Sequence, residues 1–170
     1  DTNANVILID GMTDTEVVMN TAVVTVTDAV TKAQAVTLNG FTNAKVTLQS
    51  VEDEYANIQD IKAINTAEVD MDAAAIKVTD SVDKTKVDDL RTDTTGNITL
   101  TSLTEDKVDL SAINAFTDVI LSTANITVTD NVDKSEADVI DGYSNTSGTV
   151  TLTSITDTVT NVTAVNTNAN

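Results

Sequence analysis

A short strand-like segment of the Val-Thr-Leu type, repeated six times, is the feature that most limits how this chain can fold. The six copies begin at Val17, Val46, Val69, Ile98, Val119 and Val150. The residues that lead into them repeat as well, since 9–17, 38–46 and 61–69 match position by position. Self-similarity on this scale predicts a solenoid, in which each repeat buries its apolar side only against its neighbours.

The distances between these segments alternate between long and short. From Met19 to Leu48 is 29 residues, from Leu48 to Met71 is 23, and the alternation continues to Leu152. A long and a short turn therefore pair into a unit of roughly fifty residues. We expect one array over 1–170, with a partial unit at 1–23, units at 24–75 and 76–125, and a partial unit at 126–170.

The long turns carry a second strand motif that ends in Val-Thr-Asp. It occupies 24–28, 76–80 and 126–130, at intervals of 52 and 50 residues. Apolar residues follow it at spacings of three to five, which is a helical period. We therefore expect one or two helical turns after each copy, with Asp28, Asp80 and Asp130 where an N-cap belongs.

The strands alternate Val, Ile or Leu with Thr, Asp or Lys, which predicts pleated structure with one buried and one solvent face. Val and Thr are frequent, and both favour strands. The predicted fold class is all-β: a parallel β-solenoid of about six coils with short helical turns. The alternative is a leucine-rich-repeat-like α/β solenoid, because the short turns have a suitable length and place a helix before the strand.

The chain is strongly acidic, with 27 acidic and 9 basic residues and a net charge of −18. Nucleic acid and anionic membranes are therefore not expected as partners, because no basic stripe is present to displace their counterions. No apolar run approaches the roughly 18 residues of a membrane-spanning helix, so membrane insertion is not expected either. The lack of Cys and His removes thiolate and imidazole metal ligands and the commonest general base.

Both ends of the sequence fall within the short-turn pattern. Residues 5–12 match 57–64, and 161–165 belong to the equivalent turn. Solenoids normally end in polar caps that protect the core and the strand edges. We therefore expect the chain to continue beyond this sequence or to stack end to end with a second copy. The apolar residues assigned to these assembly edges are Val6, Ile9, Met12, Val162 and Val165.

The combination of a Val-Thr-Asp strand end, a polar helical turn such as Ala33-Gln34-Ala35, a Thr-Asn or Ser-Gly corner and a Val-Thr-Leu strand resembles the degenerate repeats of giant bacterial cell-surface and adhesin-like proteins. Such repeats are abundant in marine bacteria and cyanobacteria. The resemblance covers nearly the whole chain. It implies an extracellular structural segment whose partners are other copies of itself and the cell surface or matrix.

Acidic side chains supply the hard oxygen ligands that calcium prefers. The strand-end Asp28, Asp80 and Asp130 are the candidate calcium ligands, because stacking would bring them onto one edge. Other acidic clusters lie at 52–54, 70–72, 88–89 and 105–106. None has the spacing of a calcium-binding loop, and the Gly-Gly-x-Gly-x-Asp nonapeptide is absent, so solvated faces and helix caps remain the alternative explanation.

Thr-x-Thr pairs are the other distinctive polar pattern. They lie at Thr25 and Thr27, Thr99 and Thr101, Thr127 and Thr129, and Thr151 and Thr153. Outward ladders of Thr on a β-solenoid form the binding surface of several antifreeze proteins, so ice or carbohydrate binding is an alternative function. Charged residues such as Asp70 and Lys77 interrupt the ladder, and Thr is in any case a common exposed strand residue.

The sequence contains no arrangement typical of an enzyme. Its Arg91 and eight Lys are scattered singly, and no Ser-His or Glu-Glu pair breaks the repeats. We therefore expect a structural repeat segment of a secreted bacterial surface protein, as a fibre or coat element that stacks end to end. A calcium-dependent surface-layer module is a further alternative.

Overall fold

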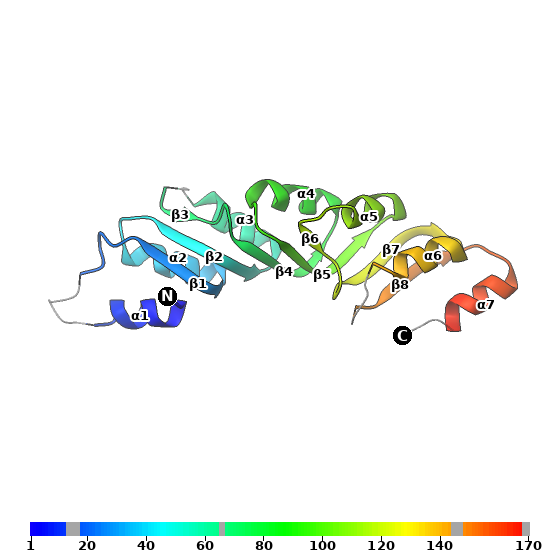
Figure 1. Ribbon diagram of the computed structural model, residues 1–170, viewed down its shortest axis with the longest axis horizontal. Coiled ribbons are helices and arrows are strands. Elements are labelled where there is room, and N and C mark those ends of the chain that lie inside the picture. Colours follow the sequence, from blue (N-terminus) through cyan, green and yellow to red (C-terminus); the bar gives the residue numbers. More distant parts are fainter. Residues whose placement is uncertain (13–17, 65–66, 144–147, 168–170) are drawn as a thin grey trace. The chain divides into compact units, whose positions relative to one another are not determined.

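The structure is a computed structural model that describes residues 1–12, 18–64, 67–143 and 148–167. A helix follows each long strand (Figure 1). The helices are α1 (Asn3–Asp10), α2 (Lys32–Phe41), α3 (Tyr55–Ala63), α4 (Lys84–Asp93), α5 (Lys107–Asn114), α6 (Lys134–Asp141) and α7 (Val159–Thr167). The strands are β1 (Val24–Val30), β2 (Val46–Asp53), β3 (Val69–Asp70), β4 (Ala75–Val82), β5 (Ile98–Glu105), β6 (Val119–Ile120), β7 (Asn125–Val132) and β8 (Val150–Ile155).

The fold class is mixed α/β, and the predicted all-β solenoid is wrong. The helices are eight to ten residues long, so they are full structural elements rather than one or two turns. Capping boxes help to start α2 at Thr31 and α6 at Asp133. Val and Thr, which favour strands, are also frequent in helices, since α7 contains three of each, so their abundance did not exclude full helices. Of the alternative fold, only the alternation of helices with parallel strands agrees with the structure.

The structure divides into two compact units. Unit 1 comprises Asp1–Thr79 and Leu90–Ile98, and unit 2 comprises Asp80–Asp89 and Thr99–Asn170. One backbone hydrogen bond recurs at the start of three strands: Val24 donates to Lys45, Ile76 to Asn97 and Ile126 to Thr149, over 2.8–3.1 Å. These bonds follow the spacing of the second strand motif, while the division of the array into units of about fifty residues stays a prediction.

In unit 1, strands pair in parallel around β2. Val24 of β1 lies opposite Val46 of β2, and β2 pairs on its other side with β4, with Val51 opposite Ile76. The short β3 pairs with the first residues of β2. Helix α1 packs against β1 and α2, and α2 packs against α3. The core lies where the apolar face of the strands meets the helices, and residues such as Leu38 and Leu48 are almost fully buried there.

In unit 2 the same arrangement recurs. Strand β5 pairs in parallel with β7, with Leu103 opposite Ile126, and β7 pairs with β8, with Val128 opposite Leu152. The short β6 pairs with β5. Helix α5 packs against β7 and α6, and α6 packs against β8 and α7. The parallel pairing with a helix between successive long strands is the usual outcome when strands alternate with helical segments.

The hydroxyl of a buried threonine forms hydrogen bonds between the turns of neighbouring repeats. Thr94 is 5% exposed, and its Oγ1 donates to the Ala74 carbonyl at 2.6 Å while accepting from the Gly96 N–H at 2.9 Å. Thr42 makes the corresponding bonds to Ala22 and Ala44. The backbones approach closely here, because a Cβ placed on Gly96 would lie 2.3 Å from the Ala74 oxygen.

We predict that Thr94→Val lowers the free energy of unfolding by roughly 2 kcal/mol, because the buried Ala74 carbonyl and the part-buried Gly96 N–H lose their partner while the shape stays the same. Urea unfolding followed by circular dichroism measures the loss. Thr37→Val is the matched control, since Thr37 is exposed on α2 and its hydroxyl donates to the Ala33 carbonyl of the same helix; its change should stay within about 0.5 kcal/mol. Equal losses for both variants would show that the buried hydroxyl is not the cause.

Candidate functional site

The candidate site is a contact that recurs between neighbouring repeats. A carboxylate at or near the end of one strand accepts a hydrogen bond from the first N–H of the helix that precedes that strand. In the part of the chain that the structure describes, pairs of this kind, which we call inter-repeat caps, include Asp28 with Asn3 (2.7 Å), Asp53 with Lys32 (2.8 Å), Glu105 with Lys84 (2.8 Å), Asp130 with Lys107 (3.0 Å) and Asp157 with Lys134 (3.0 Å).

Each inter-repeat cap satisfies a backbone group that the helix itself leaves unpaired. The first N–H groups of an α-helix have no intrahelical acceptor, and they carry the positive end of the helix dipole. A carboxylate at this position therefore gains a charge-assisted hydrogen bond. Because the donor and acceptor lie 21 to 25 residues apart in sequence, the bond joins one repeat to the next rather than stabilising a single helix.

Two of the caps arise from β-bulges. Between Val26 and Ala29 the register of β1 against β2 shifts by one residue, and the same shift occurs in β7 against β8 between Val128 and Asn131. A bulge bends the strand and re-aims the side chains within it. The bulged segments contain Asp28 and Asp130, whose carboxylates reach back to the start of α1 and α5.

In the short repeats the capping aspartate also orders the start of its own helix. Asp53 Oδ2 forms the inter-repeat cap, while its Oδ1 accepts from the Glu54 N–H at 2.9 Å and from the Asn57 side chain at 2.8 Å. Asp157 repeats this pattern with Thr158 and Asn161. One carboxylate thus holds two helix N-termini, one in its own repeat and one in the preceding repeat.

This hydrogen bonding favours the ionised carboxylates. Burial by itself would raise the pKa of Asp53, but hydrogen bonds from the Lys32 N–H, the Asn57 side chain and the N–H of the next residue outweigh burial, so the pKa lies below its ordinary value of 3.8. The Lys134 N–H is the largest cause of the lowered pKa of Asp157. Both carboxylates therefore contribute most to stability when they are charged.

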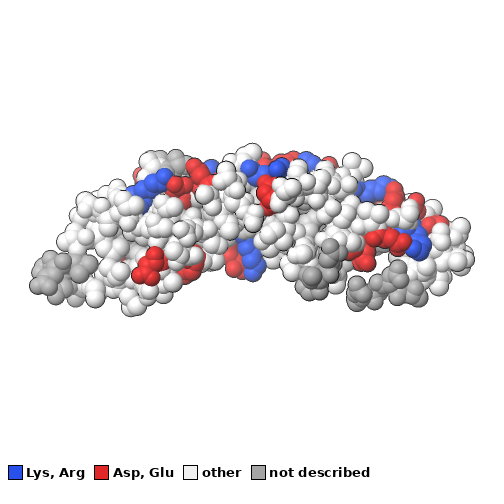
Figure 2. Space-filling view, in the orientation of Figure 1, with Lys and Arg blue, Asp and Glu red and all other residues white. Residues whose placement is uncertain are grey.

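Lysine occupies the first position of four capped helices, namely α2, α4, α5 and α6. Its ammonium group turns to another acidic side chain: Lys32 pairs with Asp60 at 2.5 Å and Lys107 with Glu136 at 2.8 Å, each on the next helix. Such exposed pairs each contribute at most about 1 kcal/mol. Figure 2 shows the resulting surface, on which many basic side chains lie beside acidic ones.

Two of the three predicted calcium ligands have a structural role. Asp28 and Asp130 form inter-repeat caps, and Asp80 lies near the end of β4. Their predicted N-cap position is wrong for two of them, because the N-caps of α2 and α6 are Thr31 and Asp133, three residues farther along the chain. Calcium binding by this trio stays a prediction.

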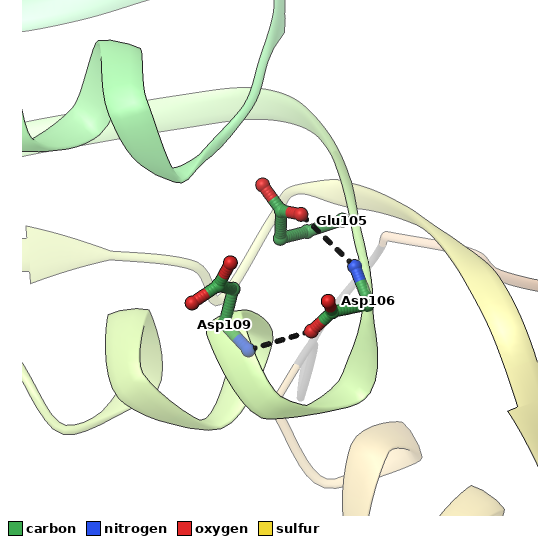
Figure 3. A group of neighbouring side chains, drawn as sticks. All are labelled: Glu105, Asp106 and Asp109. Carbon is green, nitrogen blue, oxygen red and sulfur yellow. Dashed lines mark hydrogen bonds between the residues drawn. The ribbon is translucent and has the colours of Figure 1, made fainter.

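Among the described residues, three acidic side chains do come together, at the start of α5. Ligand oxygens of Glu105, Asp106 and Asp109 lie within 4.8 Å of one another (Figure 3). Hydrogen bonds account for much of this arrangement: Glu105 accepts from the N–H groups of Lys84 and Asp106, and Asp106 accepts from those of Val108 and Asp109. The cluster is explained as a capped helix N-terminus. The sequence pattern indicated an acidic cluster at Glu105 and Asp106 but not at Asp109, although a position three residues after an N-cap Asp is a local signal for this arrangement.

The predicted assembly edges differ in exposure. Val6 is buried at 4% exposure, whereas Ile9, Met12 and Val162 are 38%, 56% and 37% exposed, and Val165 is half-buried. In the equivalent interior helix α3, Ile58 and Ile61 are fully buried. The apolar residues at both ends are thus less buried than their equivalents in α3. In α1 only Val6 of this set is buried, and in α7 both valines are partly exposed.

Charged residues border the predicted Thr surface in unit 1. Thr25 lies opposite Thr47, but Thr47 lies opposite Asp70, whose carboxylate pairs with Lys45. In unit 2, Thr104, Thr127 and Thr151 lie side by side on three adjacent strands. Ice or carbohydrate binding by the Thr-x-Thr pairs stays a prediction.

An open groove lies between α5 and α6 in unit 2. Its lining includes the exposed Val108 and Val139, with the ion pair between Lys107 and Glu136 beside them. Ser111 and Ser135 complete the lining, so the groove combines an apolar pair with polar groups.

Comparison with known protein families, curated proteins and solved structures found no similar protein. No protein-family model matches the chain, and neither a curated protein nor a solved structure is significantly similar to it. In the part of the chain that the structure describes, none of the helices has both the length and the apolar character needed to span a bilayer.

We predict that Asp53→Asn lowers the free energy of unfolding by about 1–2 kcal/mol, because an amide nitrogen replaces one of two accepting oxygens and the charge is lost. Urea unfolding at neutral pH measures the change. Asp60→Asn is the control: Asp60 is an exposed residue of α3 whose ion pair with Lys32 lies on the surface, and its loss should cost less than about 0.5 kcal/mol. A loss for Asp60→Asn as large as that for Asp53→Asn would contradict a specific role of the cap.

We also predict that the difference between wild type and Asp53→Asn depends on pH. Because the pKa of Asp53 is lowered by folding, its charge stabilises the protein above the ordinary value of 3.8, and this contribution disappears as the pH falls through the folded pKa. Denaturant titrations between neutral and strongly acidic pH should therefore show the two unfolding free energies converging below pH 3.8. A constant gap at every pH would mean that the charge contributes nothing.

Proposed function

We propose that this chain is a structural repeat segment of a secreted bacterial surface protein, acting as a fibre or coat element. The observation that supports this function best is the inter-repeat cap. Carboxylates such as Asp53 and Asp157 are used to bind one repeat to the next. Side chains used in this way serve the continuity of an array, as in repeat proteins whose stability comes from contacts between neighbours.

The chemistry of the side chains favours the same function over catalysis. The chain has no His or Cys, so a general base would have to be a carboxylate or a lysine. Catalytic carboxylates need a raised pKa or a second group facing a shared substrate. In contrast, hydrogen bonds hold the pKa values of Asp53, Asp133 and Asp157 below their ordinary range.

The extracellular part of the proposal depends on the resemblance of the repeats to those of bacterial cell-surface proteins. The charge of −18 agrees with that role, because like-charged surfaces keep a densely displayed protein from aggregating. The partners in this proposal are other copies of the repeat and the cell surface or matrix.

Immunogold labelling of cells that produce the protein tests this proposal. We expect gold particles on the outside of intact cells, and we expect external protease to remove them. A cytoplasmic protein labelled in the same cells is the control for leakage, and cells lacking the gene control for antibody specificity. Labelling confined to the cytoplasm would exclude a surface role.

A further inference from the structure

The first ten residues and residues 157–166 are two versions of the same structural segment. In both, an Asp side chain accepts hydrogen bonds from the next N–H and from the side chain of an Asn four residues later. The bonds are Thr2 and Asn5 to Asp1, both 2.8 Å, and Thr158 and Asn161 to Asp157, 2.6 and 2.9 Å. Helices α1 and α7 follow, so the two segments present the same backbone groups.

The first segment shows how such a segment binds a β1-type strand. The Asp1 nitrogen donates to the Thr25 carbonyl at 2.8 Å, and the Thr27 N–H donates to the Asp1 carbonyl at 3.0 Å. The Asn3 N–H then donates to the Asp28 carboxylate, which completes an inter-repeat cap. Asp1 thus continues the sheet at the edge of β1.

The fit of this segment to β1 is imperfect at Asn3. Its side chain is only 5% exposed, and its amide oxygen has no hydrogen-bond partner in the described part of the chain. A buried polar group without a partner is unfavourable. Apart from Asn3, Val6 is the one buried residue of α1, so few contacts hold this helix in place.

In the second segment, by contrast, apolar side chains are exposed to solvent. Val159, which is equivalent to Asn3, is 84% exposed, and Val162, which is equivalent to the buried Val6, is 37% exposed. If 157–166 occupied the place of 1–10 on β1, an apolar side chain would replace the unpaired amide, and two exposed valines would become buried. This exchange favours the second segment by the hydrophobic effect.

The apolar side chains of strand β8 are also incompletely buried. Its Val150, Leu152 and Ile155 are half-buried, whereas the equivalent Val46, Leu48 and Val51 of β2 are 0–2% exposed. On β2 the additional cover is a strand of the second motif, β4, with Val51 opposite Ile76. The first copy of that motif is β1, and the equivalent register would place Ile155 opposite Val24.

We propose that β8 and α7 of one copy bind β1 of a second copy, where they replace that copy's residues 1–10. Ile155 then lies opposite Val24, Asp157 takes the place of Asp1, and the Asp28 carboxylate caps α7 at the Val159 N–H. The proposal rests on the structural role proposed above and names the partner: another molecule of this chain.

The joint is heterologous, because it uses the β8 edge of one molecule and the β1 edge of the next. Repetition of such a contact yields an open chain of molecules unless the rotation closes a ring. Edge strands are suited to this kind of association, since their unpaired backbone groups accept a further strand.

Val159→Asp tests the joint in the whole chain of residues 1–170. Analytical ultracentrifugation from micromolar to millimolar protein should show concentration-dependent oligomers for the wild type, and Val159→Asp should raise the dissociation constant by at least about ten-fold, because it places a second carboxylate beside Asp28. Val108→Asp is the matched control, since Val108 is 70% exposed in the first turn of α5. It should associate like the wild type.

Asn3→Val tests whether α1 is displaced. This variant removes the unpaired amide and seats α1 more firmly on its own β1, so it should raise the melting temperature and weaken association. If two copies associated without displacing residues 1–10, Asn3→Val would not weaken association. Undiminished association of Asn3→Val would therefore overturn the exchange.

Two other results would also overturn the proposal: a wild type that stays monomeric up to millimolar concentration, or equal loss of association in Val159→Asp and Val108→Asp, which would place the interface elsewhere. These outcomes are separate from the immunogold result. Monomers of a protein that labels the cell surface would refute the joint alone, whereas oligomers of a protein confined to the cytoplasm would refute the surface role alone.

Discussion

The hydrogen bond between a strand-end carboxylate and the first N–H of the preceding helix is the interaction on which the other features of each unit depend. It fixes the start of a helix relative to a strand that lies more than twenty residues away in sequence. The apolar face of the strands can then pack against the helices in a constant register. The acidic composition follows in part from this use, because backbone N–H groups at helix starts favour anionic acceptors.

The repeat itself could be predicted from the sequence because it depends on local patterns. Alternation of apolar and polar residues located the long strands, as at Val46 and Ile98, and spacings such as Ala35 to Leu38 located helical segments. The predicted fold class is wrong because Val and Thr, which favour strands, also occur in the helices. Capping boxes at Thr31 and Asp133 were the local signals for full helices.

The candidate site could be predicted only in part, because its geometry is not local. Asp28 was recognised as a residue near a helix start, but the helix that it caps begins 25 residues earlier at Asn3. No spacing within a segment distinguishes these two choices. The β-bulge is marked in the sequence only by a break in the alternation, because Asp28 stands where an apolar residue would follow Thr27, and such a break does not show which way the carboxylate turns.

The inter-repeat cap also bears on how such a chain can change length in evolution. Each cap divides its donor and acceptor between adjacent repeats, so a duplicated segment one whole period long carries a free acceptor at one end and a free donor at the other. Both find partners in the flanking repeats wherever the segment was cut. Recombination that keeps the period therefore preserves every bond of this kind, and a gain or loss of whole repeats requires no compensating substitution at the new junction.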